Sequence, residues 1–104
     1  MDEAQPRQQL ISERDQEIKE ALMKTCEQVI DLVIRKRHDY GTLNMKITGR
    51  RGLAIRMLDK ASRLLTLSDV AVPQVSESLS DTYKDLIGYA LIGMHGEYWE
   101  LDDE

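Results

Sequence analysis

Three acidic residues between positions 77 and 85 have the spacing of a single helix face. Glu77, Asp81 and Asp85 follow one another at intervals of four residues, so their side chains form a column if the segment is α-helical. Like charges at this spacing repel by roughly 0.2–0.5 kcal/mol per pair, so a compensating cation is expected. A hard divalent cation such as Mg²⁺ would supply it. A solvated acidic face at a helix start, favoured by the helix dipole, is the alternative.

A basic segment in the middle of the chain carries the opposite charge. Residues 35–63 contain nine Lys or Arg against only Asp39 and Asp59, a balance of +7 in a chain of net charge −5. The rest of the chain therefore sums to −12. Because acidic flanks would repel duplex nucleic acid, the pattern predicts a small anionic ligand, such as a phosphorylated molecule. A solvated face that pairs with acidic helices of another copy is the alternative.

The elements that must position these groups are predicted to be helices alone. Ser12 and Asp15 resemble a capping box, and apolar residues then recur at helical spacing. Gly41 ends this first helix, residues 41–50 are expected to form a loop, and Ser76 is the expected N-cap of the last helix. The three predicted helices span residues 13–38, 51–67 and 77–95.

The chain of 104 residues is expected to form one small all-α domain. Residues 12–95 make up this helical bundle, with a loose arm before it (1–11) and an acidic tail after it (96–104). The first helix is apolar over nearly half its circumference near 29–34, more than two short helices can cover. A homo-oligomer, either a dimer or a tetramer, is therefore predicted to complete the bundle.

The sequence also indicates the cellular compartment of the protein. No apolar run approaches the roughly 20 residues needed to span a bilayer, and the polar, acidic N-terminus does not resemble a signal peptide. Cys26 is the only cysteine, which excludes an internal disulfide and fits a reducing compartment. We predict a cytoplasmic protein without a membrane partner, with Cys26 facing the core.

The acidic and basic groups are expected to meet in one site. If the second and third helices are antiparallel neighbours, Asp59 approaches the carboxylates of the third. Basic side chains of the second helix would then face a polyphosphate held by Mg²⁺. Carboxylates that hold Mg²⁺, together with cations on the phosphates, are the groups that hydrolysis of a phosphoanhydride needs. At the end of the first helix, Tyr40 and Asn44 are placed to contact a base or sugar and Lys36 to reach a phosphate. The predicted substrate-binding residues are Lys36, Tyr40, Asn44, Arg56, Lys60 and Arg63. A salt-bridge network is the alternative role for Asp59 and Lys60.

Three blocks of the sequence together resemble a known family. They read K-R-H-D-Y-G-x-x-N (36–44), R-M-L-D-K-A-S-R-L (56–64) and E-S-L-S-D-T-x-x-D-L-x-x-Y-A (77–90). Together they are similar to the MazG-like families of the all-α NTP pyrophosphohydrolase superfamily. The most similar branch is that of the nucleotide modification-associated domains found in phages and bacteria. The similarity covers about residues 20–95.

The resemblance implies Mg²⁺-dependent hydrolysis of a nucleoside triphosphate to the monophosphate and pyrophosphate, with Mn²⁺ as an alternative metal. Glu77, Asp81 and Asp85 would be catalytic, and together with Asp59 they would bind the metal. The family pattern pairs E-x-x-E with E-x-x-D, whereas this chain has only Asp59 on the second helix and Thr82 in place of a glutamate. This departure leaves a second function open, a module that binds a nucleotide without cleaving it. Such a module would be a nucleotide sponge or an accessory to nucleotide modification.

Overall fold

The computed structural model describes residues 12–69 and 78–101, and this part of the chain is all-helical. It contains α2 (Glu13–Tyr40), α3 (Leu43–Ser68), α4 (Leu79–Met94) and the short 3₁₀ helix η1 (Gly96–Trp99). The predicted all-α fold with three main helices is confirmed. None of the helices in these ranges combines the length and apolar character that crossing a membrane would require. The predicted N-terminal arm lies outside the described residues.

Helix α2 begins where its capping box predicts. The Ser12 hydroxyl accepts a hydrogen bond from the Asp15 backbone N–H at 3.0 Å, and the Asp15 carboxylate accepts one from the Ser12 N–H at 3.3 Å. These bonds satisfy two of the backbone donors that a helix start leaves without partners. The helix ends at Gly41, whose φ of 70° is accessible mainly to glycine.

Helix α3 begins eight residues earlier than predicted, so the expected loop over 41–50 is wrong for most of its length. The chain turns at Gly41 and Thr42 and is helical again from Leu43, with a bend at Gly49 (φ 65°, ψ −166°). Glycine tolerates the backbone conformations found at these two bends, but the residues between them include no helix breaker. Asn44, expected in a loop, therefore lies in the first turn of α3.

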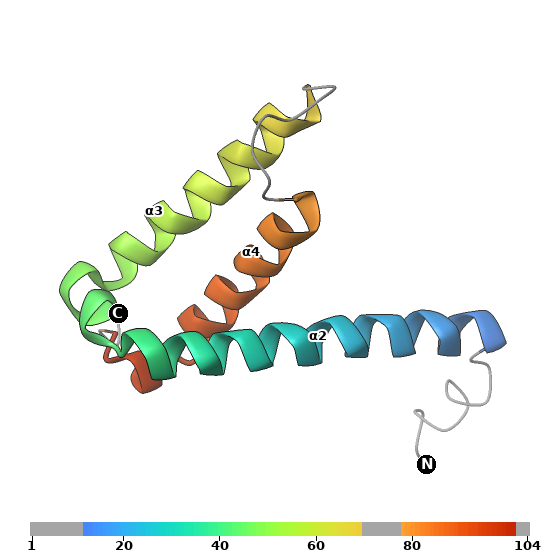
Figure 1. Cartoon of the computed structure of the whole chain (residues 1–104), viewed down its shortest axis with the longest axis horizontal. Helices are drawn as coiled ribbons and strands as arrows, with labels where there is room; N and C mark the ends of the chain where they lie inside the picture. The colour runs from blue at the N-terminus through green and yellow to red at the C-terminus, as the bar shows by residue number, and fades with distance from the viewer. Residues whose placement is uncertain (1–11, 70–77, 102–104) are drawn as a thin grey trace, which may run out of the picture.

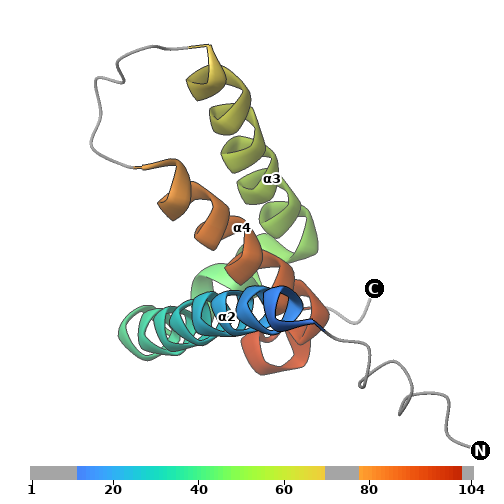
Figure 2. The same cartoon turned by 90° about the vertical axis from the view of Figure 1, so that its right-hand side faces the viewer.

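Helix α4 runs antiparallel to α3, and the two pack side by side (Figures 1 and 2). The condition that we set for Asp59 to approach the last helix is therefore met. It begins at Leu79 with Ser78 as its N-cap, not at residue 77. The predicted cap Ser76 and the predicted site residue Glu77 lie outside the described residues. The C-terminal half of α4 also contacts α2, which crosses beneath the α3–α4 pair (Figure 1).

The core lies where the C-terminal end of α4 meets the bend between α2 and α3. Leu53, Ile92, Trp99 and Leu101 form a buried cluster. Arg37 fixes the last turn, because its guanidinium donates to the Tyr98 carbonyl at 2.8 and 3.0 Å and lies 5.7 Å from the centre of the Trp99 ring. Residues 96–101, which the sequence suggested as the beginning of an acidic tail, are therefore part of the packed domain.

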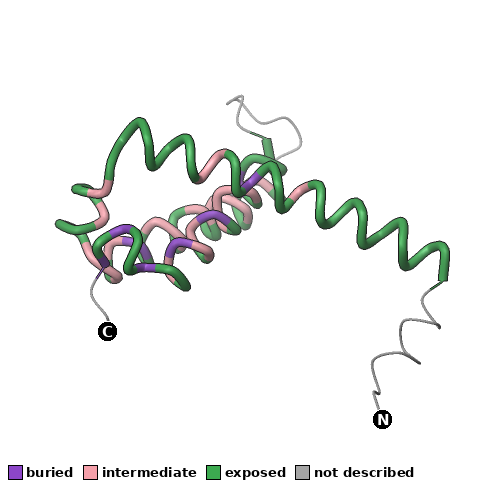
Figure 3. The backbone as a smooth tube through the Cα atoms, turned by 90° about the horizontal axis from the view of Figure 1, so that it is seen from below, coloured by how far each residue is buried: buried purple, intermediate pink, exposed green. Residues whose placement is uncertain are grey.

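The N-terminal half of α2 extends beyond the other helices and is exposed along almost all of its length (Figures 1 and 3). Its apolar side chains include Ile18, Leu22 and Met23, which are 44–63% exposed. Cys26 on the same stretch is exposed, so the prediction that it faces the core is wrong.

Candidate functional site

A narrow cleft of about 100 Å³ separates the C-terminal half of α2 from α4. Gly88 keeps it narrow, because a Cβ at this position would lie 3.1 Å from Val33 on the facing helix. The floor is apolar and includes Val29 and Ile92. The polar rim comes from α2, the start of α3 and α4, and includes Lys36, Arg37, Tyr40, Asn44, Lys84 and Asp85.

The cleft brings together four residues that the sequence analysis assigned to the site. Lys36, Tyr40 and Asn44, predicted to bind substrate, line it together with Asp85 from α4. Tyr40 is 75% exposed and so lies at the mouth, not on the floor. The prediction that the end of the first helix contributes to a cleft of the bundle is consistent with this arrangement.

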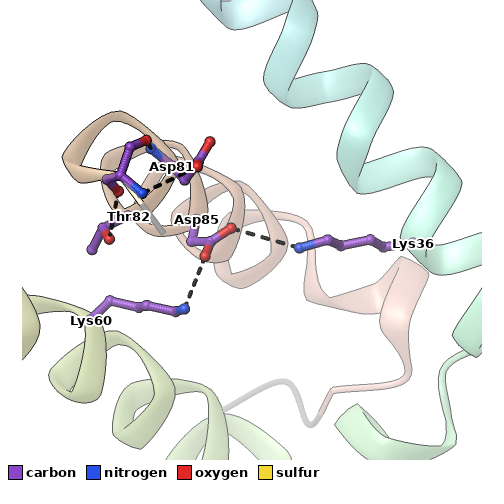
Figure 4. A network of polar contacts seen from close by, with 6 residues as sticks. Lys36, Lys60, Asp81, Thr82 and Asp85 are labelled. Atoms are coloured by element: carbon purple, nitrogen blue, oxygen red, sulfur yellow. Dashed lines mark hydrogen bonds and ion pairs between the residues drawn. The ribbon is translucent and has the colours of Figure 1, made fainter. Parts of the chain in front are cut away.

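Asp85 on α4 forms ion pairs with lysines of the other two helices. Its Oδ1 lies 3.6 Å from Nζ of Lys36 on α2, and its Oδ2 lies 3.0 Å from Nζ of Lys60 on α3 (Figure 4). The Asp85 and Lys60 side chains are only 17% and 19% exposed. An ion pair this far from water is stronger than a surface pair, although removing the charges from water also costs more.

Asp81, one turn before Asp85, caps the start of α4. Its backbone N–H donates to the Ser78 hydroxyl at 3.0 Å, and its carboxylate accepts from the Ser78 N–H at 3.4 Å. Hydrogen bonding to the Ser78 side chain, and secondarily to the Ser78 backbone, lowers the pKa of Asp81 from its usual value. Asp81 therefore lies at a solvated helix start, which is the alternative to metal binding that we considered for this carboxylate.

Thr82 stands where the MazG-like pattern that the sequence resembles has a glutamate, and its surroundings do not suit a charged side chain. Its side chain is completely buried, and its hydroxyl donates to the Ser78 carbonyl at 3.2 Å. A carboxylate at this position would be buried in the interior, where an ionised group is costly unless it is paired.

The described residues do not form a site for a divalent cation. Each oxygen of Asp85 faces an ammonium group, in the position that a cation would take. Asp59 is exposed on α3, and within residues 12–69 and 78–101 no three His, Cys, Asp or Glu side chains are close enough to hold a metal ion. Because Glu77 lies outside these ranges, the predicted set Asp59, Glu77, Asp81 and Asp85 stays a prediction.

The basic residues of α3 have different surroundings. Lys60 reaches Asp85, whereas Arg56 donates to the Met45 sulfur at 3.2 Å. Arg63 is half-buried one turn beyond Lys60, and none of these three basic residues lines the cleft. Arg50, which we expected in a loop, donates to the Gly93 carbonyl at 3.0 Å and so supports the end of α4.

Two basic residues of the cleft were missed. Arg37 was counted in the basic segment but not assigned to the site, and Lys84 was given no role. The signal for Lys84 was present, since Lys84, Gly88 and Ile92 are spaced by four residues and share one face of α4.

Comparison with known proteins identifies one family. The model described as "Nucleotide modification associated domain 1" matches residues 36–95, which include the polar rim of the cleft and all of α4. Neither the curated proteins nor the solved structures include a significant match to the chain.

Proposed function

The chain belongs to the family described as nucleotide modification associated domain 1, and from this premise we propose that it binds the phosphate end of a nucleotide in the cleft between α2 and α4. Lys36 and Lys60 would face the phosphate, while Tyr40 and Asn44 would contact the base or the sugar at the mouth. Arg63 and Arg56 would add positive charge from α3 around the polyphosphate.

The observation that carries this proposal is the convergence of two lysines from different helices on one anionic group. Lys36 and Lys60 approach the same carboxylate from α2 and α3, at 3.6 and 3.0 Å. Two ammonium groups arranged around an anion are well suited to a phosphate. Lys36 and Asp85 line the cleft, and Lys60 reaches Asp85 from α3. Arg37 and Lys84 line the same cleft and strengthen the positive potential that would attract such a ligand.

The size of the cleft limits which part of the ligand enters it. Sites for complete small-molecule ligands usually measure roughly 300–1,000 Å³, several times the volume found here. The cleft of one chain therefore suits one phosphate group, and the rest of a nucleotide would lie along the exposed mouth. There the Tyr40 ring offers a stacking surface and Asn44 offers both a donor and an acceptor.

Binding without cleavage is the function we favour. Hydrolysis would need carboxylates that are available to a metal, and both oxygens of Asp85 are paired with lysines until a ligand displaces them. Mg²⁺-dependent pyrophosphohydrolysis of the MazG-like type is the second candidate. It rests on the sequence resemblance and on the position of Asp85 beside Lys36 in the cleft.

One experiment separates the two functions. The protein is incubated with the common ribo- and deoxyribonucleoside triphosphates plus Mg²⁺, and the mixture is chromatographed before and after the protein is denatured. Intact nucleotide that is released only on denaturation supports binding. Accumulation of monophosphate and pyrophosphate supports hydrolysis. Full recovery of free nucleotide at both stages would contradict both candidates.

We also propose that two copies associate through α2, as a dimer or as half of a tetramer, in the cytoplasm. Ile18, Leu22, Cys26 and Val29 follow one another at intervals of three or four residues and form an apolar seam along one face of α2. The seam packs on α4 at Val29, but towards the N-terminus no helix of the described chain covers it. Acidic residues occupy the first turn of α2 and basic residues the last. Two α2 helices packed antiparallel would therefore bring opposite charges together while covering both apolar seams.

A further inference from the structure

The Asp85 carboxylate occupies the position that the proposed function assigns to a phosphate. Each of its oxygens faces one of the two lysines, at 3.6 and 3.0 Å, so Asp85 lies between α2 and α3 as a bridging anion (Figure 4). Ammonium groups bind carboxylates and phosphates by the same charge-assisted hydrogen bonds. A ligand phosphate that approaches Lys36 and Lys60 must therefore compete with an anion of the protein itself.

We propose that Asp85 is an internal competitor that holds the ligand's place in the free protein, and that a polyphosphate binds by displacing it from the two lysines. The proposal rests on the proposed function, because it takes Lys36 and Lys60 as the phosphate-binding groups. It adds a specificity role for Asp85. A ligand must interact with the lysines more strongly than a carboxylate does, which favours the multiply charged phosphates of a nucleotide over monoanions.

The charges at the site support an exchange of this kind. Asp85 carries one negative charge and faces two ammonium groups, and Arg37 and Lys84 line the cleft together with Lys36 and Asp85. A phosphate with two or more charges neutralises both lysines. Lysine side chains can turn between two acceptors without backbone movement, and Lys36 is half exposed. After the exchange, the Asp85 carboxylate lies beside the phosphate and repels it, which lowers the affinity further.

Asp85→Asn tests the competition, because it removes the charge and keeps the shape. The matched control is Asp31→Asn, which makes the same change at an exposed position of α2 that does not line the cleft. Binding of inorganic tripolyphosphate and of a nucleoside triphosphate is measured by calorimetry in EDTA, so that no divalent cation takes part. We expect Asp85→Asn to bind both ligands about tenfold more tightly than the wild type or more. We expect Asp31→Asn to differ from the wild type by less than about threefold at physiological salt.

A second substitution shows whether the gain acts through the lysines. In a Lys60→Gln background, Asp85→Asn is expected to lose most of its benefit, because one of the groups for which the ligand competes is gone. If Asp85→Asn does not unfold cooperatively, Asp85→Ser takes its place in both comparisons. Wild-type binding with no gain in the Asp85 variant, or an equal gain in Asp31→Asn, overturns the competition alone. Absence of binding by every variant, including the wild type, overturns the proposed phosphate site as well.

Discussion

Nζ of Lys60 lies 3.0 Å from Oδ2 of Asp85, a contact that joins α3 to α4 halfway along their antiparallel packing. The other oxygen of Asp85 faces Lys36 of α2, so one carboxylate ties the three helices together beside the cleft. This relationship has two consequences. It shows where the basic and acidic parts of the sequence meet, and it makes each of these side chains both a structural group and a candidate ligand group.

The first prediction concerns phosphate recognition by Lys60. Lys60→Gln should weaken the binding of a nucleoside triphosphate about tenfold or more, since a charge-assisted hydrogen bond contributes about 1.5–3 kcal/mol and about 1.4 kcal/mol is one factor of ten. The loss should be smaller for the monophosphate, because it brings fewer negative charges to the lysine than the triphosphate does. Calorimetric titration with both nucleotides checks this result.

Arg51→Ala is the appropriate control for this prediction. Arg51 belongs to the same basic segment and is exposed at the start of the straight part of α3, so its loss should change the affinity little. Arg50 is unsuitable as a control because it supports the end of α4. Equal losses for tri- and monophosphate, or equal losses in Lys60→Gln and Arg51→Ala, would show that the lysine does not contact the polyphosphate.

A second prediction concerns Mg²⁺. Because both oxygens of Asp85 are paired with lysines, we expect the protein without nucleotide to bind Mg²⁺ no more tightly than exposed carboxylates do. Any Mg²⁺ uptake should accompany the triphosphate, which carries its own oxygen ligands. Titration of Mg²⁺ into the nucleotide-free protein, with melting temperature as a second measurement, tests this. Saturable Mg²⁺ binding to the free protein that disappears in Asp85→Asn would instead support the metal site predicted from the sequence.

The helices that were predicted correctly are those with strong local signals. The capping box at Ser12 and the helical spacing of the apolar residues after it define α2, which ends at Gly41. The same local rules failed between Gly41 and Gly49. Glycine permits a bend, but it does not decide whether the residues between two bends form a loop or a turn of helix. Packing decided that question here, with Met45 against the core cluster.

The site could be predicted as a set of residues but not as a set of contacts. Lys36, Tyr40, Asn44 and Asp85 do share one cleft. The spacing of the carboxylates suggested a metal as their counter-ion, whereas the crossing of α2 under α4 brings lysines to Asp85. The burial of Trp99 depends on contacts such as that between Arg37 and Tyr98, which are 61 positions apart. Contacts over such distances have no signature in local sequence.

A third prediction concerns the start of α4. Ser78→Ala removes the N-cap and should lower the free energy of unfolding by about 0.5–2 kcal/mol. Ser80→Ala, at an exposed position in the same turn, is the control and should have little effect. Urea unfolding followed by far-UV circular dichroism measures both. An equal effect of the two substitutions would show that the capping hydroxyl does not stabilise the helix.

A fourth prediction follows from the lowered pKa of Asp81. The pKa of this carboxyl in the folded protein is below the usual value of 3.8 because of its hydrogen bonds to Ser78, so the unfolded chain binds its proton more readily. The stabilising contribution is therefore complete above pH 3.8 and is lost as the pH falls through the lower pKa of the folded state. Unfolding measured over this acidic range should show a smaller loss of stability in Asp81→Asn than in the wild type. Identical pH profiles for the two proteins would contradict the assignment.

The last prediction concerns assembly through α2. Leu22 is 63% exposed on the part of the seam that the described chain leaves open, and its burial against a second copy would contribute about 1.5–3 kcal/mol per side chain. We therefore expect the wild type to be a dimer or tetramer at micromolar concentration, and Leu22→Asp to shift it towards the monomer. Lys24→Asp introduces the same group on the opposite face of α2, and should leave the assembly intact. Light scattering of the three proteins measures the mass directly. A wild-type particle of 12.0 kDa, or dissociation by both substitutions alike, would contradict a dimer interface on this seam.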